Sequence, residues 1–166
     1  MTKEYLAHQI YLKWFSNKYI YDAVMTTLYN VSKDYAEAMG DFDEPRLFPT
    51  FNIKKYYTGM AMGAHFDQLD GDKTLRYSLV MYLNDDCEGG EISFYDGEAQ
   101  KVYDYKPKAG DVTVFPGFEP YYHGVLPFNG DDRYLLRMFW FWNYEGSNDW
   151  HLNKNKYGEE KWKMIE

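Results

Sequence analysis

The chain has 166 residues, a length that fits one domain with a sizeable hydrophobic core. Its formal charge of −8 and isoelectric point near 5.0 argue against a protein that binds bare nucleic acid, because phosphate backbones are normally met by clustered Lys and Arg. The single cysteine, Cys87, excludes an internal disulfide, and no stretch resembles a signal peptide or a bilayer-spanning helix. We therefore expect a soluble, cytoplasmic protein.

The first predicted element is a helix over residues 19–40. Gly40 and the acidic stretch that leads to Pro45 predict where it ends. Apolar side chains recur in it at steps of three and four, which is the spacing of one helix face: Ile20, Val24, Leu28, Val31, Tyr35 and Met39. Such an amphipathic helix needs an apolar surface to cover.

After residue 46 the sequence is typical of an all-β sandwich or barrel. Runs rich in Tyr, Val, Phe and Leu alternate with turn signals such as Gly89-Gly90 and Asp96-Gly97. Residues 146–166 have a charged, helix-compatible composition, and no repeat or linker divides the chain, so we predict a single domain over residues 1–166. The predicted strands are Ile53–Tyr57, Thr74–Leu83, Glu91–Phe94, Lys101–Tyr105, Asp111–Phe115, Tyr122–Leu126 and Arg133–Trp142.

The strand predicted over Thr74–Leu83 has two faces of different polarity. Successive side chains of a strand point to opposite sides, so this run presents one apolar and one more polar row. We expect the apolar row to lie under the N-terminal helix and the polar row to point into the barrel. The apolar row is Leu75, Tyr77, Leu79, Met81 and Leu83, and the other is Thr74, Arg76, Ser78, Val80 and Tyr82.

A possible metal site begins at His65-Phe66-Asp67. Residues i and i+2 of an extended segment project from the same side, so the imidazole and the carboxylate can reach one ion. His123 follows 58 residues later and can complete the two-histidine, one-carboxylate triad of non-haem iron(II) oxygenases. An isolated H-x-D tripeptide is weak evidence, because a strand histidine is more often a hydrogen-bonded polar residue than a ligand.

Further landmarks follow His65-x-Asp67 in a fixed order. In that order they resemble the prolyl 4-hydroxylase branch of the 2-oxoglutarate- and iron(II)-dependent dioxygenases. The resemblance covers about residues 53–142, and the segments before 46 and after 146 show no match. The landmarks are Tyr82-Leu83-Asn84, Gly89-Gly90-Glu91, Pro107 with Gly110-Asp111, His123 with Pro127, Arg133-Tyr134 and Trp140.

The resemblance implies a mainly β fold, a double-stranded β-helix (a jelly-roll or cupin-like barrel) with N-terminal helices packed on its larger sheet. It implies iron(II), 2-oxoglutarate and dioxygen, with ascorbate as a reductant. His65, Asp67 and His123 look like the metal ligands. Arg133 looks like the partner of the distal carboxylate of 2-oxoglutarate, a role that suits a guanidinium. Tyr82 looks like its hydroxyl partner, and Tyr57 is a further candidate for the pocket.

Alternatives remain for these residues. Arg133 can be a solvent-exposed strand arginine, or Arg137 can take its place, since period 2 puts both on one face. Tyr82 and Tyr57 can be packing residues. Gly89 and Gly90 are expected to form a turn between strands, because no phosphate-binding pattern follows them.

The activity that the resemblance implies is hydroxylation of a C–H bond, with succinate and carbon dioxide as products. We expect the substrate to be a prolyl residue in a peptide or protein, and we expect no nucleic-acid or membrane partner; the oligomeric state is left open. The alternatives are a hydroxylase of another residue or of a small molecule, and a metal- or sugar-binding barrel without turnover. The chain lacks the H-x-H with a later Glu and His that is usual in cupins, which favours the enzyme.

Overall fold

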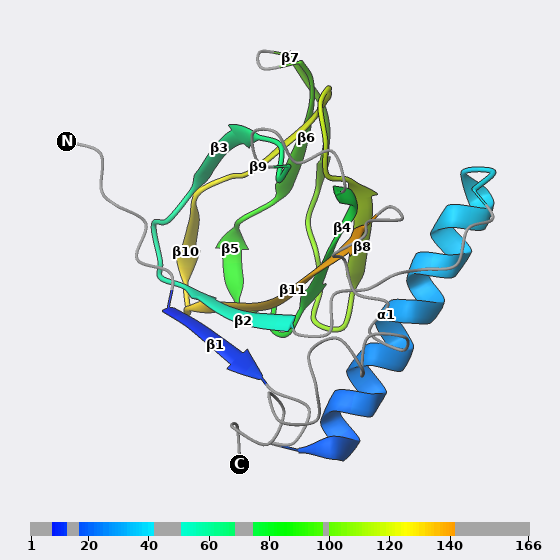
Figure 1. Ribbon diagram of the computed structural model, residues 1–166. Coiled ribbons are helices and arrows are strands. Elements are labelled where there is room, and N and C mark those ends of the chain that lie inside the picture. The colour runs from blue at the N-terminus through cyan, green and yellow to red at the C-terminus, as the bar shows by residue number, and fades with distance from the viewer. Residues whose placement is uncertain (1–7, 13–16, 42–50, 69–74, 98–99, 142–166) are drawn as a thin grey trace.

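The computed structural model describes residues 8–12, 17–41, 51–68, 75–97 and 100–141, and they form a mainly β fold with one helix at its side (Figure 1). The helix is α1 (Lys18–Ala38). The strands are β1 (His8–Leu12), β2 (Phe51–Tyr56), β3 (Met62–His65), β4 (Leu75–Tyr82), β5 (Cys87–Gly89), β6 (Ile92–Asp96), β7 (Gln100–Tyr105), β8 (Val112–Pro116), β9 (Tyr121–Val125), β10 (Phe128–Gly130) and β11 (Arg133–Phe141).

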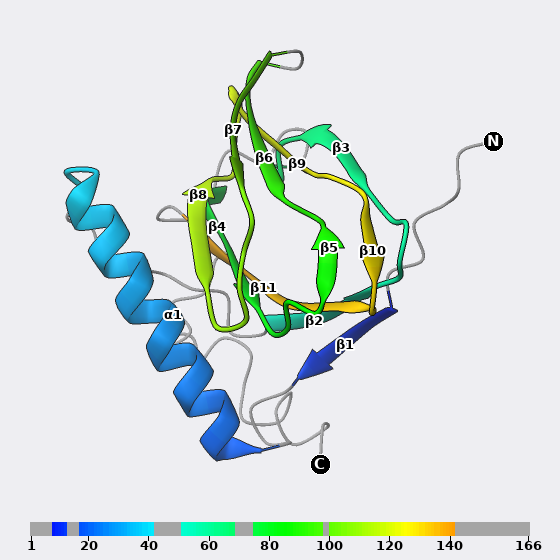
Figure 2. The same ribbon diagram turned by 180° about the vertical axis from the view of Figure 1, so that it is seen from behind.

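Two antiparallel sheets lie face to face and form a flattened barrel, which Figures 1 and 2 show from its two ends. The larger sheet has the order β1-β2-β11-β4-β8, and the smaller has the order β3-β9-β6-β7. A short ribbon of β10 and β5 closes one side. Since neighbours in each sheet are distant in sequence, the chain passes repeatedly between the sheets, as the predicted jelly-roll requires.

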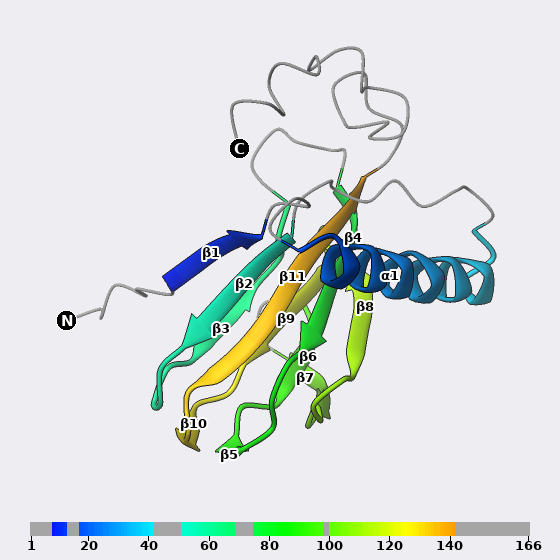
Figure 3. The same cartoon turned by 90° about the horizontal axis from the view of Figure 1, so that it is seen from below.

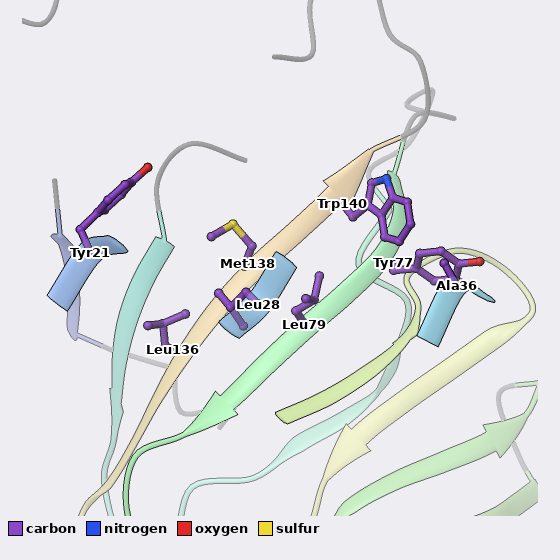
Figure 4. Close-up of a cluster of buried hydrophobic side chains, with 8 residues drawn as sticks. All are labelled: Tyr21, Leu28, Ala36, Tyr77, Leu79, Leu136, Met138 and Trp140. Atoms are coloured by element: carbon purple, nitrogen blue, oxygen red, sulfur yellow. The ribbon is translucent and has the colours of Figure 1, made fainter. Parts of the chain in front are cut away.

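Helix α1 covers the outer face of the larger sheet, as predicted (Figures 3 and 4). Asn17 caps it by accepting a hydrogen bond from the backbone N–H of Ile20 at 3.3 Å. The buried helix face packs on side chains of β4 and β11 and consists of Tyr21, Leu28, Ser32 and Ala36. The predicted face is therefore rotated: Ile20 is 53% exposed and Met39 60%. Within the described ranges, one N-terminal helix is present, and it is not apolar enough along its 21 residues to cross a membrane.

The two faces of β4 are confirmed along most of its length. Tyr77 and Leu79 lie in the core beneath α1, whereas Val80 and Tyr82 belong to a second core between the two sheets. The alternation fails at the start of the strand, where the pairing of β4 with β11 shifts register beside Trp140.

That shift reverses two predicted positions. Leu75 lies beside Gly117 together with Ser78, on the inner side of the sheet. Arg76 instead has its guanidinium 5.0 Å from the Trp140 ring and pairs with Asp41, just beyond α1. Leu83, predicted to lie under the helix, is 41% exposed because β4 has ended by then.

All seven predicted strands are present with boundaries shifted by a few residues, and four others were not predicted: β1, β3, β5 and β10. Strand β3 has the sequence MGAH, and β5 and β10 have three residues each, so none of them shows an alternating pattern. The predicted ends at Thr74 and Trp142, and the tail 146–166, lie outside the described residues.

Candidate metal centre and its pocket

Antiparallel pairing of β3 and β9 places His65 directly opposite His123. Asp67 follows two residues after His65, so the triad forms where β3 ends beside the middle of β9. One potential ligand atom of each residue lies within 4.8 Å of the others. Nε2 of His123 is 3.4 Å from one carboxylate oxygen of Asp67, and Nε2 of His65 is 3.8 Å from the other. The structure thus brings the three sequence-predicted residues together.

Hydrogen bonds around the triad orient its donors. Nδ1 of His65 lies 2.9 Å from the backbone carbonyl oxygen of Gly63, which can only accept, so this nitrogen carries the proton and Nε2 presents a lone pair. Burial, and then the charge of His123, lowers the pKa of His65, which favours the neutral form that binds metals. Nδ1 of His123 is buried and has no hydrogen-bond partner among the described residues.

Asp67 is held as a carboxylate between the two sheets. Its Oδ2 accepts a hydrogen bond from the Ser78 hydroxyl at 2.7 Å, and its Oδ1 lies 3.4 Å from Nη1 of Arg137. Burial alone would raise the pKa of Asp67, but the hydrogen bond and charge of His123, with Ser78 and Arg137, outweigh it and lower the pKa well below its usual value. Two imidazoles and an ionised carboxylate are a ligand set that fits a divalent transition metal such as iron(II).

A cavity of about 440 Å³, which includes the part open to solvent, lies between the sheets and contains the triad. Its polar wall is formed by Tyr56, Tyr82, Arg133 and Arg137. Its apolar wall comes mainly from Val80, Ile92, Phe115, Val125 and Leu135. A second hollow of about 240 Å³ shares Arg133 and Leu135 and continues towards Met60 and Phe128.

Arg133 is buried at the start of β11, with 3% of its surface exposed, so the solvent-exposed alternative is wrong. Its guanidinium donates to the backbone carbonyl of Gly90 and lies 4.9 Å over the ring of Tyr82. Gly90 has a φ of +73°, and a Cβ there would lie 2.8 Å from Nη1 of Arg133. Gly90 therefore makes room for the arginine in addition to the turn predicted for it.

The tyrosines near Arg133 differ from one another in position. Tyr82 is 2% exposed, lines the cavity, and has its hydroxyl 3.4 Å from that of Thr113; burial raises its pKa. Tyr57 is not among the lining residues, and the Lys55 amine lies 4.9 Å from its ring centre. The preceding Tyr56 lines the cavity instead and stands opposite Arg133 in the β2–β11 register.

Lys54 is a residue near the site that sequence reasoning missed. It is 7% exposed and stands opposite Leu135 on β11. Burial, and then the charge of Arg137, lowers its pKa to about 8. Lys54 is two residues before Tyr56, and this spacing indicates that both side chains lie on the same face of the strand. A lysine at such a position is usually exposed to solvent, so the sequence alone did not suggest a buried one.

Comparison with known proteins gives both a family and a fold. Residues 51–142, more than half of the chain, match the family model described as the 2OG-Fe(II) oxygenase superfamily. A search of curated protein sequences gave no match.

Among solved structures, the viral collagen prolyl hydroxylase vCPH of Paramecium bursaria Chlorella virus 1, in its 2OG complex, aligns with a TM-score of 0.61 and 17% identity over 84% of this chain and 80% of that one. A 2OG-Fe(II) oxygenase family oxidoreductase from Burkholderia pseudomallei aligns with a TM-score of 0.52 and 20% identity over 64% of this chain and 50% of its own. A prolyl-4-hydroxylase from Pseudomonas putida shares 29% identity over 55% of this chain and 51% of its own, with a TM-score of 0.47.

The chain thus spans about half the length of the two bacterial proteins. The alignment with vCPH confirms the predicted double-stranded β-helix. The family match includes the whole segment from β2 to β11, on which the triad and Arg133 lie. The chain belongs to the 2OG-Fe(II) oxygenase superfamily.

Proposed function

We propose that this protein is an iron(II)- and 2-oxoglutarate-dependent dioxygenase that hydroxylates a C–H bond, with a prolyl residue of a peptide or protein as the favoured substrate. The observation that carries the proposal is the convergence of two imidazole Nε2 atoms and the Asp67 carboxylate within 4.8 Å, at a cavity that also contains a buried arginine. His65, Asp67 and His123 are the proposed ligands. Bound iron(II) supplies dioxygen activation coupled to oxidative decarboxylation of 2-oxoglutarate.

The protein's own contribution to the metal site is orientation. Gly63 fixes the tautomer of His65, and Ser78 and Arg137 fix the Asp67 carboxylate. Partners of this kind hold ligating side chains in place and tune their basicity. Because Ser78 and Arg137 belong to the larger sheet and both histidines to the smaller, the site depends on the packing of the two sheets.

Arg133 is the proposed partner of the distal carboxylate of 2-oxoglutarate. Within the part of the chain that the structure describes, no carboxylate pairs with this buried guanidinium, and a buried cation without an anion is unfavourable. Its Nη1 donates to Gly90, and the other donors of its planar fork remain for a ligand. At about 3.4 Å per residue, Arg133 lies about 14 Å along β11 from Arg137, so one carboxylate cannot contact both arginines. Tyr82 and Tyr56 are the proposed hydroxyl partners beside it.

The apolar wall has a role in protecting the reaction. Phe115 and Val80 line the cavity next to the triad, and the Phe115 ring centre is 4.5 Å from that of His123. Such side chains exclude water that would otherwise consume the oxidant.

The prolyl substrate is supported by the resemblance of residues 53–142 to the prolyl 4-hydroxylase branch and by the apolar side chain of Leu135 in the cavity wall. vCPH, which shares this fold, is named as a collagen prolyl hydroxylase. Ascorbate is the proposed external reductant. Hydroxylation of another residue or of a small molecule is the second candidate.

The test is succinate formation from 2-oxoglutarate by the iron(II)-loaded protein, with and without proline-containing peptides and with mass spectrometry of the peptides. We expect peptide-stimulated succinate and a gain of one oxygen on proline. Oxygen on Lys, Asn or Asp with proline unchanged would contradict the substrate alone. The proposed function would be contradicted if the protein failed both to bind 2-oxoglutarate and to form succinate under every condition.

A further inference from the structure

Two cationic side chains project to the inner side of the larger sheet near the triad, one from each of two neighbouring strands: Arg137 lines the cavity, and Lys54 lies behind the cavity's lining residues. Residues directly opposite each other in an antiparallel pair project to the same side of the sheet. Lys54 stands opposite Leu135, which lines the cavity, so Lys54 projects to that side as well. Arg137 is two residues from Leu135 on the same strand and lines the cavity itself.

These two cations have few partners of their own. Arg137 reaches Asp67 at 3.4 Å, and its Nε is buried without a hydrogen-bond partner among the described residues. Lys54 is 7% exposed, and no described residue forms a hydrogen bond or ion pair with its amine. Among the described residues, one buried carboxylate therefore faces a buried lysine and a partly exposed arginine, an arrangement that a further anion would stabilise.

The metal centre makes this imbalance larger. Asp67 is a proposed metal ligand, so its negative charge is shared between the bound ion and Arg137. The distal carboxylate of 2-oxoglutarate is assigned to Arg133, which is far along β11. A further anionic group beside Lys54 and Arg137 would balance their charge.

We propose that Lys54 and Arg137 form a second carboxylate-binding subsite that holds an acidic group of the oxidised substrate, either an Asp or Glu side chain near the reacting residue or a terminal carboxylate. This inference rests on the proposed function and adds the chemical class of the substrate. The other source of the same chemistry is the keto-acid end of 2-oxoglutarate.

Exposure favours the substrate as the source. The side chains of Arg137 and His65 are 26% and 31% exposed, whereas Arg133 is 3% exposed, so Arg137 lies on the side of the cavity that is open to solvent, with the buried Lys54 behind it. In a chain with a formal charge of −8, this local positive site selects an acidic group at one position and gives no general attraction for polyanions.

The experiment uses the full chain loaded with Mn(II) and 2-oxoglutarate, so that the readout is binding without turnover. A pool of random pentapeptides with free and amidated C-termini is equilibrated with the immobilised protein, and bound peptides are sequenced by mass spectrometry. The best acidic peptide and its Gln, Asn or amide counterpart are then titrated by calorimetry. The variants are Lys54→Met and Arg137→Met, and the matched control is Lys55→Met, whose amine pairs with Asp132 on the outer side.

We expect wild type and Lys55→Met to enrich acidic peptides and to bind the acidic peptide about tenfold or more tightly than its neutral counterpart, the scale of one charge-assisted contact. Lys54→Met and Arg137→Met should each bring that ratio close to one, and Lys54→Met, which removes no hydrogen bond to the triad, should leave the affinity for 2-oxoglutarate unchanged. Their melting temperatures verify folding, and Lys54→Met should not melt earlier, because it removes a buried cation without a partner.

Three other results overturn the inference. If both variants lose 2-oxoglutarate affinity and the peptide ratio stays unchanged, the carboxylate is that of the keto acid. If neither affinity changes, the two cations serve only to orient Asp67. If no acidic peptide is preferred by the wild type while 2-oxoglutarate binds normally, the subsite is wrong and the proposed function stands; failure of the wild type to bind 2-oxoglutarate at all contradicts the proposed function instead.

Discussion

Arg133 and Arg137 share one face of β11 but have different surroundings. Arg133 is fully enclosed and faces a carbonyl and two tyrosines, whereas Arg137 is beside the Asp67 carboxylate and closer to solvent. Period 2 on a strand predicted the shared face, but it could not tell which arginine is the deeper one, because depth depends on how the two sheets close around the strand.

The two arginines should respond differently to removal of their charge. Arg133→Met should weaken 2-oxoglutarate binding by about 2–3 kcal/mol, because a charge-assisted bidentate contact is lost. Arg137→Met should have a much smaller effect on that affinity. Calorimetric titration of the Mn(II)-loaded variants with 2-oxoglutarate measures both. A large effect for Arg137→Met alone would assign the distal carboxylate to Arg137, at the middle of β11.

Gly90 provides a second test at this scale. Gly90→Ala puts a methyl group 2.8 Å from Nη1 of Arg133 at a φ of +73°, so it should displace the guanidinium and weaken 2-oxoglutarate binding. Backbone strain at a positive φ should also cost about 1 kcal/mol of stability. Gly97→Ala is the matched control, because its φ is +69° and nothing lies within 4 Å of its Cβ position.

Both substitutions should therefore lower the unfolding free energy, measured in urea, by similar amounts. Only Gly90→Ala should change the affinity for 2-oxoglutarate. Equal affinities in the two variants would show that the contact between Gly90 and Arg133 is not needed for binding.

At the scale of elements, the strands with clear alternation were predictable and the short ones were not. β4 and β11 have eight and nine residues with well-defined faces, whereas β3 has four residues that include Gly63. β3 is a strand because it pairs with β9 through the triad region, a long-range contact that no local pattern contains. The H-x-D motif thus located the site without its strand being predicted.

The helix is a similar case, since its presence was predicted correctly and its buried face only in part: Val24, Leu28 and Tyr35 pack on the core, whereas Ile20 and Met39 are exposed. Its hydrophobic residues extend around more than one face, so the choice between Ile20 and Tyr21 depends on the shape of the sheet beneath. Tyr21 is buried and Ile20 is exposed because Tyr21, seven residues before Leu28, shares the helix face that packs on β4 and β11.

Leu28 should therefore contribute strongly to stability. Leu28 is completely buried between α1 and the larger sheet, so Leu28→Ala should lower the unfolding free energy by about 2–5 kcal/mol. Ile20→Ala, at a position 53% exposed, should change it by less than about 0.5 kcal/mol. Urea unfolding followed by circular dichroism compares them. A similar loss in both variants would mean that α1 does not pack in this orientation.

At the scale of the whole molecule, the candidate metal centre joins the two sheets. Its histidines come from β3 and β9, and the groups that hold Asp67 come from β4 and β11. The family resemblance pointed to the three proposed ligands and to Arg133, because these residues follow one another at fixed intervals. It did not predict Lys54, Ser78 or Tyr56, whose positions follow from the register of β2, β4 and β11.

A site that links the sheets should stabilise the whole fold when it is filled. A metal that binds only the folded state at about 100 times its dissociation constant adds about 2.7 kcal/mol. Mn(II) should therefore raise the melting temperature of the wild type, and a chelator should reverse the rise.

Asp67→Ala should remove the metal-dependent rise while the metal-free variant still unfolds cooperatively, because Asp67 lies at the cavity and outside both hydrophobic cores. Ser78→Ala keeps the three ligands and loses one hydrogen bond to the carboxylate, so it should retain a smaller metal-dependent rise. An undiminished rise in Asp67→Ala would exclude this triad as the metal site.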